Sequence, residues 1–142
     1  MGNAPFSLCK NLLQIIVESG NTHYTSVDGV LFNKAKTFLV QYPNGNERST
    51  YDVPSGVTTI GYSAFWGNSA LISITLPAKL TTIENSAFED CSGLKSIIVK
   101  SKNPPAVDES SFNGIKLSEV TLYIPKGSRT AYAKAPVWKE FK

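Results

Sequence analysis

The chain has 142 residues, of which 42% are hydrophobic and 18% are charged, and its formal net charge is +3. This length and composition predict one globular domain, and no apolar run approaches the roughly 18 consecutive residues of a transmembrane helix. The 14 basic residues are spread along the chain among 11 acidic ones. This distribution argues against nucleic-acid binding, which requires basic side chains clustered on one face.

The first predicted element is an incomplete repeat between Phe6 and Val17. Its apolar residues have the same spacing as those from Phe88 to Val99, further along the chain. We therefore expect the chain to begin within a coil of a repeat structure and to be a piece of a longer protein. The incomplete coil is also a candidate surface for self-association.

Residues 18–50 break this spacing and are predicted to form an irregular coil with a hairpin. Two β-rich runs, 30–32 and 37–42, flank the four residues 33–36, which is the length of a common hairpin loop. Asp28 and Gly29 indicate a further turn. We interpret this insertion as part of the same domain.

Residues 54–76 and 77–99 repeat one another position by position, so that Pro54 corresponds to Pro77. A fixed period of this size indicates stacked coils. Each repeat ends in an alternation of apolar and polar residues, which predicts a strand with one buried face. The expected parallel strands are 73–76, 96–99 and 121–124, with Val120 and Leu122 in the columns of Ile97 and Val99. The expected interior stack consists of Phe6, Phe65, Phe88 and Phe112.

Residues 125–142 are predicted to form a helical cap. Ser128 is a candidate N-cap for a helix over residues 129–135. Trp138 and Phe141 then provide large apolar side chains that can cover the last coil.

The two cysteines, Cys9 and Cys91, fall in one column of the repeat but several coils apart. At about 4.8 Å per coil they are too far apart for a disulfide, which requires Cα atoms within roughly 7 Å. We expect both to be buried free thiols.

The run Ile-Gly-x-x-Ala-Phe-x-x-(Asn/Cys)-x-x-Leu-x-x-Ile-x-Leu-Pro, which starts at Ile60, resembles the BspA-type leucine-rich repeat of bacterial and some protist surface proteins. The segments 28–34 and 123–128 match as well, so the resemblance covers the chain from Phe6 onward. It implies a right-handed leucine-rich repeat solenoid, α/β to mostly β, over residues 1–142. It also implies a cell-surface or secreted protein that adheres to host proteins, glycans or other cells.

No pattern in the sequence predicts catalysis. His23 is the only histidine, and it has no cysteine or acidic cluster at metal-ligand spacing. The acidic pairs 89–90 and 108–109 are neighbours in sequence, which rarely converge as a general acid and base. Phosphate-binding and nucleophile motifs are absent from the sequence. We therefore expect no enzyme activity, no metal and no cofactor.

Binding is the remaining class of function, and the outer side of the strand ladder is the candidate surface. Gln14 and Ile16 occupy the same columns in the incomplete coil. Trp66, in the column of Glu89, is a secondary candidate, either as a binding hot spot or as packing against the irregular coil. The main candidates are the outward residues Thr50, Asp52, Ser73, Thr75, Ser96, Ile98, Glu119, Thr121 and Tyr123.

Two hypotheses follow for the whole chain. In the first, it is an adhesion module that binds a protein or glycan. In the second, it is a rigid spacer or terminal cap that presents another domain and has no ligand of its own.

Overall fold

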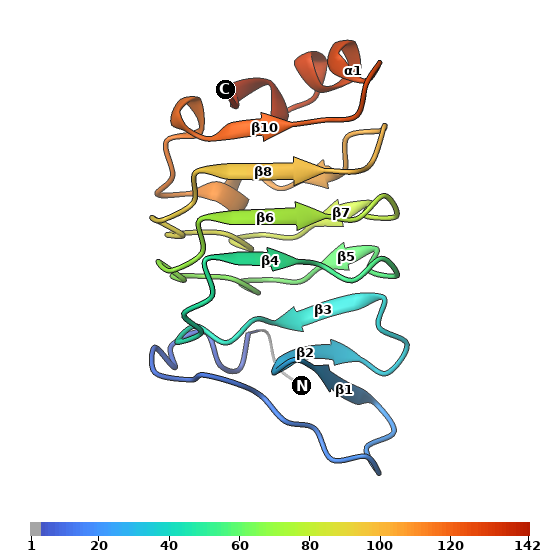
Figure 1. Ribbon diagram of the computed structural model, residues 1–142, viewed down its shortest axis with the longest axis vertical. Helices are drawn as coiled ribbons and strands as arrows, with labels where there is room; N and C mark the ends of the chain where they lie inside the picture. The colour runs from blue at the N-terminus through green and yellow to red at the C-terminus, as the bar shows by residue number, and fades with distance from the viewer. Residues whose placement is uncertain (1–3) are drawn as a thin grey trace.

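The computed structural model describes residues 4–142, which wind as a right-handed solenoid along one long axis (Figure 1). Two sheets lie on opposite sides of this solenoid, and loops connect them at both edges. The predicted solenoid with a ladder of parallel strands is confirmed.

The four-stranded sheet consists of the strands that end each repeat, all parallel, in the order β10-β8-β6-β4. Its strands are β4 (Thr50–Asp52), β6 (Ser73–Leu76), β8 (Ser96–Val99) and β10 (Thr121–Tyr123). Ile74 and Ile97 are in register and fully buried, whereas Thr75 between the buried positions is only half-buried. The alternation of apolar and polar residues therefore has the expected effect of burying one side of each strand.

The six-stranded sheet has the order β1-β2-β3-β5-β7-β9 and contains the hairpin. Its strands are β1 (Tyr24–Val27), β2 (Val30–Asn33), β3 (Phe38–Gln41), β5 (Thr59–Ile60), β7 (Thr82–Ile83) and β9 (Ala106–Val107). β2 and β3 pair antiparallel, as predicted, and β1 adds a third antiparallel strand that the sequence did not indicate. β3 then pairs in parallel with β5, which joins the irregular coil to the regular ones.

Aromatic rings stack along the interior, one per coil. The ring centroids of Phe65 and Phe88 are 4.9 Å apart, and those of Phe88 and Phe112 are 5.2 Å apart, with nearly parallel planes in both pairs. At the other end the stack continues to Tyr42, 4.8 Å from Phe65. The predicted place of Phe6 in this stack is wrong, because Tyr42 occupies that position and Phe6 lies outside the core cluster.

A second column, of polar and thiol side chains, satisfies backbone groups at the turns. The Asn68 amide nitrogen donates to the carbonyl oxygens of Asn44 and Asn46, and its oxygen accepts from the Leu71 amide. One coil further, the buried Cys91 thiol donates to the Phe65 carbonyl oxygen at 3.0 Å. Both cysteines are free, but the expected burial of Cys9 is wrong, because that residue is exposed.

The N-terminal segment follows the coil path without forming a strand. Residues 11–17 have no regular secondary structure, although the Ile15 amide donates to the Gly29 carbonyl oxygen and the Gly45 amide to the Leu12 carbonyl oxygen. The spacing of apolar residues in this segment therefore predicted its path but not its conformation.

The last coil is shifted by two residues from its predicted register. Leu122 pairs with Ile97, so the repeat is longer at this point and Leu122 does not continue the column of Val99. Two short 3-10 helices, η1 (Glu109–Phe112) and η2 (Leu117–Glu119), absorb the additional residues. The strand predicted over 121–124 is confirmed, but the predicted assignment of Val120 and Leu122 to the columns of Ile97 and Val99 is wrong.

The C-terminal cap consists of α1 (Arg129–Lys134) and η3 (Trp138–Glu140). Trp138 is buried, and its indole nitrogen donates to the Pro105 carbonyl oxygen at 2.7 Å. The Lys142 backbone exchanges hydrogen bonds with Val120 and Leu122 and so covers the free edge of β10. Ser128 occupies the predicted N-cap position of α1, but its side chain makes no capping hydrogen bond, because its hydroxyl donates to the Pro125 carbonyl oxygen.

Candidate functional site

The outer side of the four-stranded sheet carries two rows of side chains, which we call the sheet face. Strand pairing places equivalent residues of neighbouring coils side by side in each row, at about 4.8 Å per step. One row consists of Thr50, Ser73, Ser96 and Thr121. The other consists of Asp52, Thr75, Ile98 and Tyr123.

The first row consists of small hydroxyl side chains that satisfy one another in part. The Ser96 hydroxyl donates to the Ser73 hydroxyl at 2.8 Å, and both residues are half-buried. These groups form a smooth polar strip with little protruding surface.

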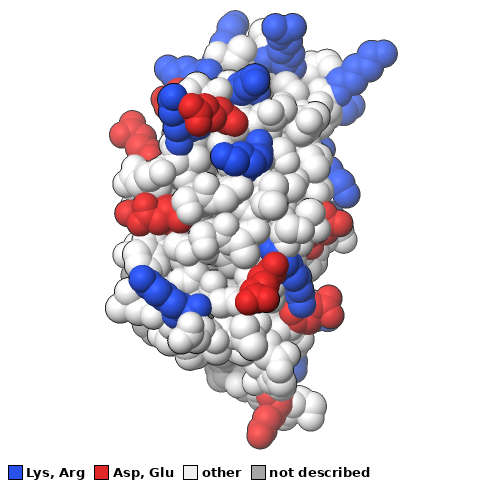
Figure 2. Space-filling model, turned by 60° about the vertical axis from the view of Figure 1, so that its left-hand side comes forward, with Lys and Arg blue, Asp and Glu red and all other residues white. Residues whose placement is uncertain are grey.

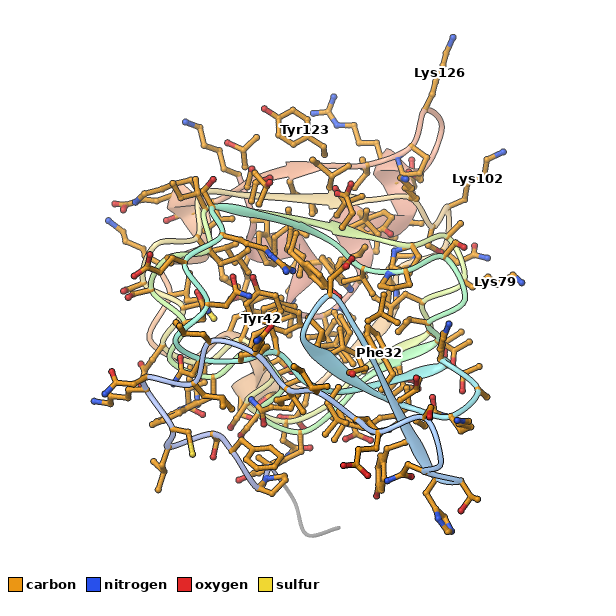
Figure 3. All side chains as sticks on the ribbon, turned by 60° about the horizontal axis from the view of Figure 1, so that its bottom comes forward. Phe32, Tyr42, Lys79, Lys102, Tyr123 and Lys126 are labelled. Atoms are coloured by element: carbon orange, nitrogen blue, oxygen red, sulfur yellow. The ribbon has the colours of Figure 1, made fainter. Side chains whose placement is uncertain are left out.

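The second row is the more prominent one and becomes increasingly apolar toward β10. Asp52 is its only charged residue and is exposed. Ile98 is 36% exposed, and its in-register neighbour Tyr123 is 56% exposed. Figure 3 shows Tyr123 projecting outward, in contrast to Phe32 and Tyr42, which lie within the coils. An exposed aromatic and aliphatic pair in a sparsely charged setting has the composition of an interface core.

Three predicted candidates lie outside the sheet face. Glu119 belongs to η2, and its carboxylate forms an ion pair with Lys116 at 2.6 Å. Its predicted position in the column of Ser96 is wrong because of the two-residue shift. Thr121 takes that position, and Tyr123 takes the position opposite Ile98 that was predicted for Thr121. Gln14 and Ile16 are exposed, but they belong to the segment that forms no strand.

Trp66 is half-buried and lies after Phe65, away from the sheet face. It lines a hollow of about 400 Å³ together with Leu8, Tyr62 and Glu89. Tyr62, 42% exposed, was not among the predicted residues. The signal that could have revealed it is an aromatic residue at a position where the next repeat has Asn85.

Few side chains of the described residues could act as a catalytic or metal-binding group. His23 is exposed, with its Nδ1 3.0 Å from the Thr22 hydroxyl. Burial raises the pKa of the Cys91 thiol to about 12, so this group is not a reactive thiolate at neutral pH. Within residues 4–142, no three histidine, cysteine or acidic side chains are grouped to hold a metal ion.

The acidic pair 108–109 has a structural role. The Asp108 carboxylate accepts hydrogen bonds from the Ser110 hydroxyl and amide at the start of η1, and these bonds lower the pKa of Asp108. The carboxylate therefore acts as a helix cap. Among residues 4–142, no helix has the length and apolar character needed to cross a bilayer.

The N-terminal end of the solenoid exposes apolar side chains. Leu8, Leu13 and Ile16 are 78%, 61% and 74% exposed, respectively. Beside them lies a hollow of about 580 Å³, lined mainly by apolar residues that include Phe6 and Tyr24. The C-terminal end, in contrast, is covered by Trp138.

The sequence of the coils decides the family. Residues 45–133, more than half of the chain, match the model of the BspA type leucine-rich repeat region. The chain belongs to the BspA-type leucine-rich repeat family. No curated protein sequence matches this BspA-type chain.

Solved structures with the same fold include three bacterial proteins. A leucine-rich cell-surface protein from Faecalibacterium prausnitzii is 22% identical with a TM-score of 0.64, and the match covers 92% of this chain and 47% of that one. A leucine-rich repeat protein from Eubacterium ventriosum is 20% identical, with a TM-score of 0.59 and coverage of 87% and 45%. The pneumococcal vaccine antigen PcpA is 20% identical, with a TM-score of 0.55 and coverage of 85% and 47%. The BspA-type chain thus spans about half the length of each of these proteins.

Proposed function

We propose that this chain is a non-catalytic adhesion module of a cell-surface or secreted protein, and that it binds a protein partner through the sheet face. The family is a repeat scaffold, and one protein of the same fold is described as a cell-surface protein. The observation that carries the proposal is the exposed Ile98 and Tyr123 pair beside a strip of small hydroxyl side chains.

A partner has to contact several coils at once, because each coil contributes only two side chains to the sheet face. Specific interfaces bury about 800 Å² per partner, which is far more than one coil offers. The flat, in-register rows make such an extended contact possible, and aromatic residues such as Tyr123 are frequent binding hot spots.

The double substitution Thr75→Arg and Ile98→Arg tests this proposal. It places two long charged side chains in adjacent positions of the same row without altering the buried columns. We expect loss of binding to whichever extracellular-matrix protein or epithelial cell the unmodified chain binds, with a change in melting temperature of only about 1–2 °C because both sites are at the surface. Surface plasmon resonance and a cell-adhesion assay measure the binding.

The matched control is Ser69→Arg with Ser92→Arg, which adds the same charge at exposed loop residues. This control should bind normally. Normal binding by the Thr75 and Ile98 variant would place the site elsewhere, with the Trp66 hollow and the loop at 33–36 as the next regions to test. No binding to any matrix protein or cell would favour the alternative role, a rigid spacer or cap.

We also propose that the exposed apolar end around Leu8, Leu13 and Ile16 mediates self-association of this chain in isolation. Large apolar side chains this exposed on one short segment are typical of a surface that another copy covers. The substitutions Leu8→Ser, Leu13→Ser and Ile16→Ser should shift a concentration-dependent dimer to monomer in analytical ultracentrifugation. A chain that is monomeric before substitution, at about 100 μM, a concentration well above typical micromolar dissociation constants, would contradict this proposal.

A further inference from the structure

The solenoid brings lysines from distant parts of the sequence to one edge. Five loops lie at this edge. Residues 34–37, 53–58, 77–81 and 100–105 connect strands, and residues 124–128 connect β10 to α1. They contain none of the 11 acidic residues of the chain. They contain six lysines, which we call the lysine edge: Lys34, Lys36, Lys79, Lys100, Lys102 and Lys126.

The backbone fixes these loops in a stack. The Thr58 amide donates to the Thr37 carbonyl oxygen at 2.8 Å, and the Thr81 amide to the Thr58 carbonyl oxygen at 2.9 Å. The Ala106 amide, just after the fourth loop, donates to the Thr81 carbonyl oxygen at 2.8 Å. The loops therefore follow one another at the coil spacing, and four steps of about 4.8 Å give a charged strip on the order of 19 Å long.

All six lysines of this edge are exposed, and none forms an ion pair within residues 4–142. Figure 3 shows Lys79, Lys102 and Lys126 projecting from the same edge of the molecule. The acidic residue that comes nearest along the chain is Asp52, which lies on the sheet face just before the second loop.

The opposite edge has a different charge pattern. Its loops, residues 43–49, 66–72, 89–95 and 113–120, contain four acidic and three basic residues. Figure 2 shows charges of both signs interspersed over a mostly uncharged surface on this side. The low net charge of the chain thus conceals a separation of charge between its two edges.

We propose that the lysine edge is a docking strip for a linear sulfated glycan lying along the solenoid axis. Lysine ammonium groups are mobile point charges on long stems, so they can adapt to sulfate groups distributed along a flexible polysaccharide. Like charges at the coil spacing repel one another, because about 5 Å is shorter than the Debye length of about 8 Å at physiological salt. A polyanion along the strip removes this repulsion.

The composition of the edge favours a glycan over other polyanions. The five loops contain no aromatic side chain, whereas single-stranded nucleic-acid sites combine basic residues with aromatic stacking platforms. They also contain few large apolar residues that could insert into a membrane interface, in contrast to membrane-binding surfaces. The strip is narrow and runs in one direction, which matches a single extended chain of sulfated sugars.

The test uses heparin as the sulfated glycan and the triple substitution Lys79→Gln, Lys102→Gln and Lys126→Gln. We expect the unmodified chain to bind immobilised heparin at about 0.15 M salt, the ionic strength at which surface charges are screened beyond about 8 Å. The triple variant should bind about tenfold more weakly, from the loss of three exposed charge contacts, and elute from a heparin column at lower salt. Its melting temperature should not change, because all three side chains are exposed.

The matched control is Lys10→Gln, Lys95→Gln and Lys139→Gln, which removes the same charge from exposed lysines outside this edge. The control should retain most of the affinity for heparin. Equal losses in both variants would overturn the proposal, because net charge alone would then govern binding. Failure of the unmodified chain to bind heparin would overturn it, as would stronger binding to duplex DNA of matched charge or to phosphatidylserine vesicles. Each outcome is separate from that of the sheet-face test, which uses different residues and protein partners.

Discussion

Replacing Phe88 with alanine is expected to lower the free energy of unfolding by about 3–5 kcal/mol, the usual cost of truncating a fully buried phenylalanine. The Phe88 ring is fully buried between those of Phe65 and Phe112, at 4.9 and 5.2 Å. Its removal leaves a cavity in the middle of the stack, at the point where the coils on either side meet.

The cavity has little freedom to collapse, which favours the upper part of this range. The Phe65 amide donates to the Ala87 carbonyl oxygen, and the Phe88 amide to the Ser111 carbonyl oxygen, both at 2.8 Å. These bonds hold the coils at a fixed spacing, so neighbouring rings cannot move together without breaking the ladder. Chemical denaturation analysed by linear extrapolation gives the free energy of unfolding.

The matched control is Phe141→Ala, at the end of the same aromatic cluster. Phe141 is only half-buried, although its ring lies 5.2 Å from that of Phe112. We expect a smaller loss of about 1–2 kcal/mol, because truncation at a partly open site leaves no closed cavity. A loss below about 1 kcal/mol for Phe88→Ala would contradict the interior stack, since truncation of a buried ring costs more than that.

The regular coils could be predicted from the sequence because their length does not vary. Ser73, Ile74 and Leu76 pair with the equivalent residues of the next repeat, so the register of the strands is the register of the repeated motif itself. Where the period is constant, equivalent residues must occupy the same place in consecutive coils, so β6 and β8 and the stacking of Phe65 on Phe88 follow directly.

The register of β10 could not be predicted, because a strand pattern has a period of two. A shift by one residue exchanges the two faces, but a shift by two leaves every inward residue inward. Thr121 is therefore on the outer side in either register. Its outward neighbour on the sheet face is Glu119 in the predicted register and Tyr123 in the observed one. The local conformation of residues 113–119, which includes η2, determines the choice, and the repeat spacing contains no information about it.

The conformation of the N-terminal segment and the position of the lysine edge are two further features that the repeat pattern did not predict. A strand requires a continuous row of backbone partners, and residues 11–17 make only scattered hydrogen bonds, such as those to Gly29 and Gly45, so their apolar spacing is not sufficient. The lysine edge is not apparent in the linear sequence, because its basic residues lie far apart along the chain and come together only across the coils. Lys79, Lys102 and Lys126 recur at nearly the period of the coils, which is the signal that could have revealed it.

Deleting residues 136–142 is expected to convert the protein to dimers or insoluble aggregates. This segment contains Trp138 and Phe141, which contact the Phe112 ring at centroid distances of 6.3 and 5.2 Å. It also contains Lys142, whose amide donates to the Val120 carbonyl oxygen at 3.0 Å and whose carbonyl oxygen accepts from the Leu122 amide at 3.1 Å. The deletion thus exposes an apolar surface and the free edge of β10 at the same time.

An exposed apolar strand edge is a template for pairing with another chain, so the deletion should promote edge-to-edge association. Size-exclusion chromatography with light scattering measures the mass, and the soluble fraction after expression measures aggregation. The control Lys139→Ala with Glu140→Ala changes exposed residues of the same segment and should remain in the oligomeric state of the unmodified chain. A deletion variant with unchanged mass and unchanged stability would contradict the proposed cap, because Trp138 and Phe141 would then not cover the last coil. The loss of a buried tryptophan alone should cost about 3–5 kcal/mol.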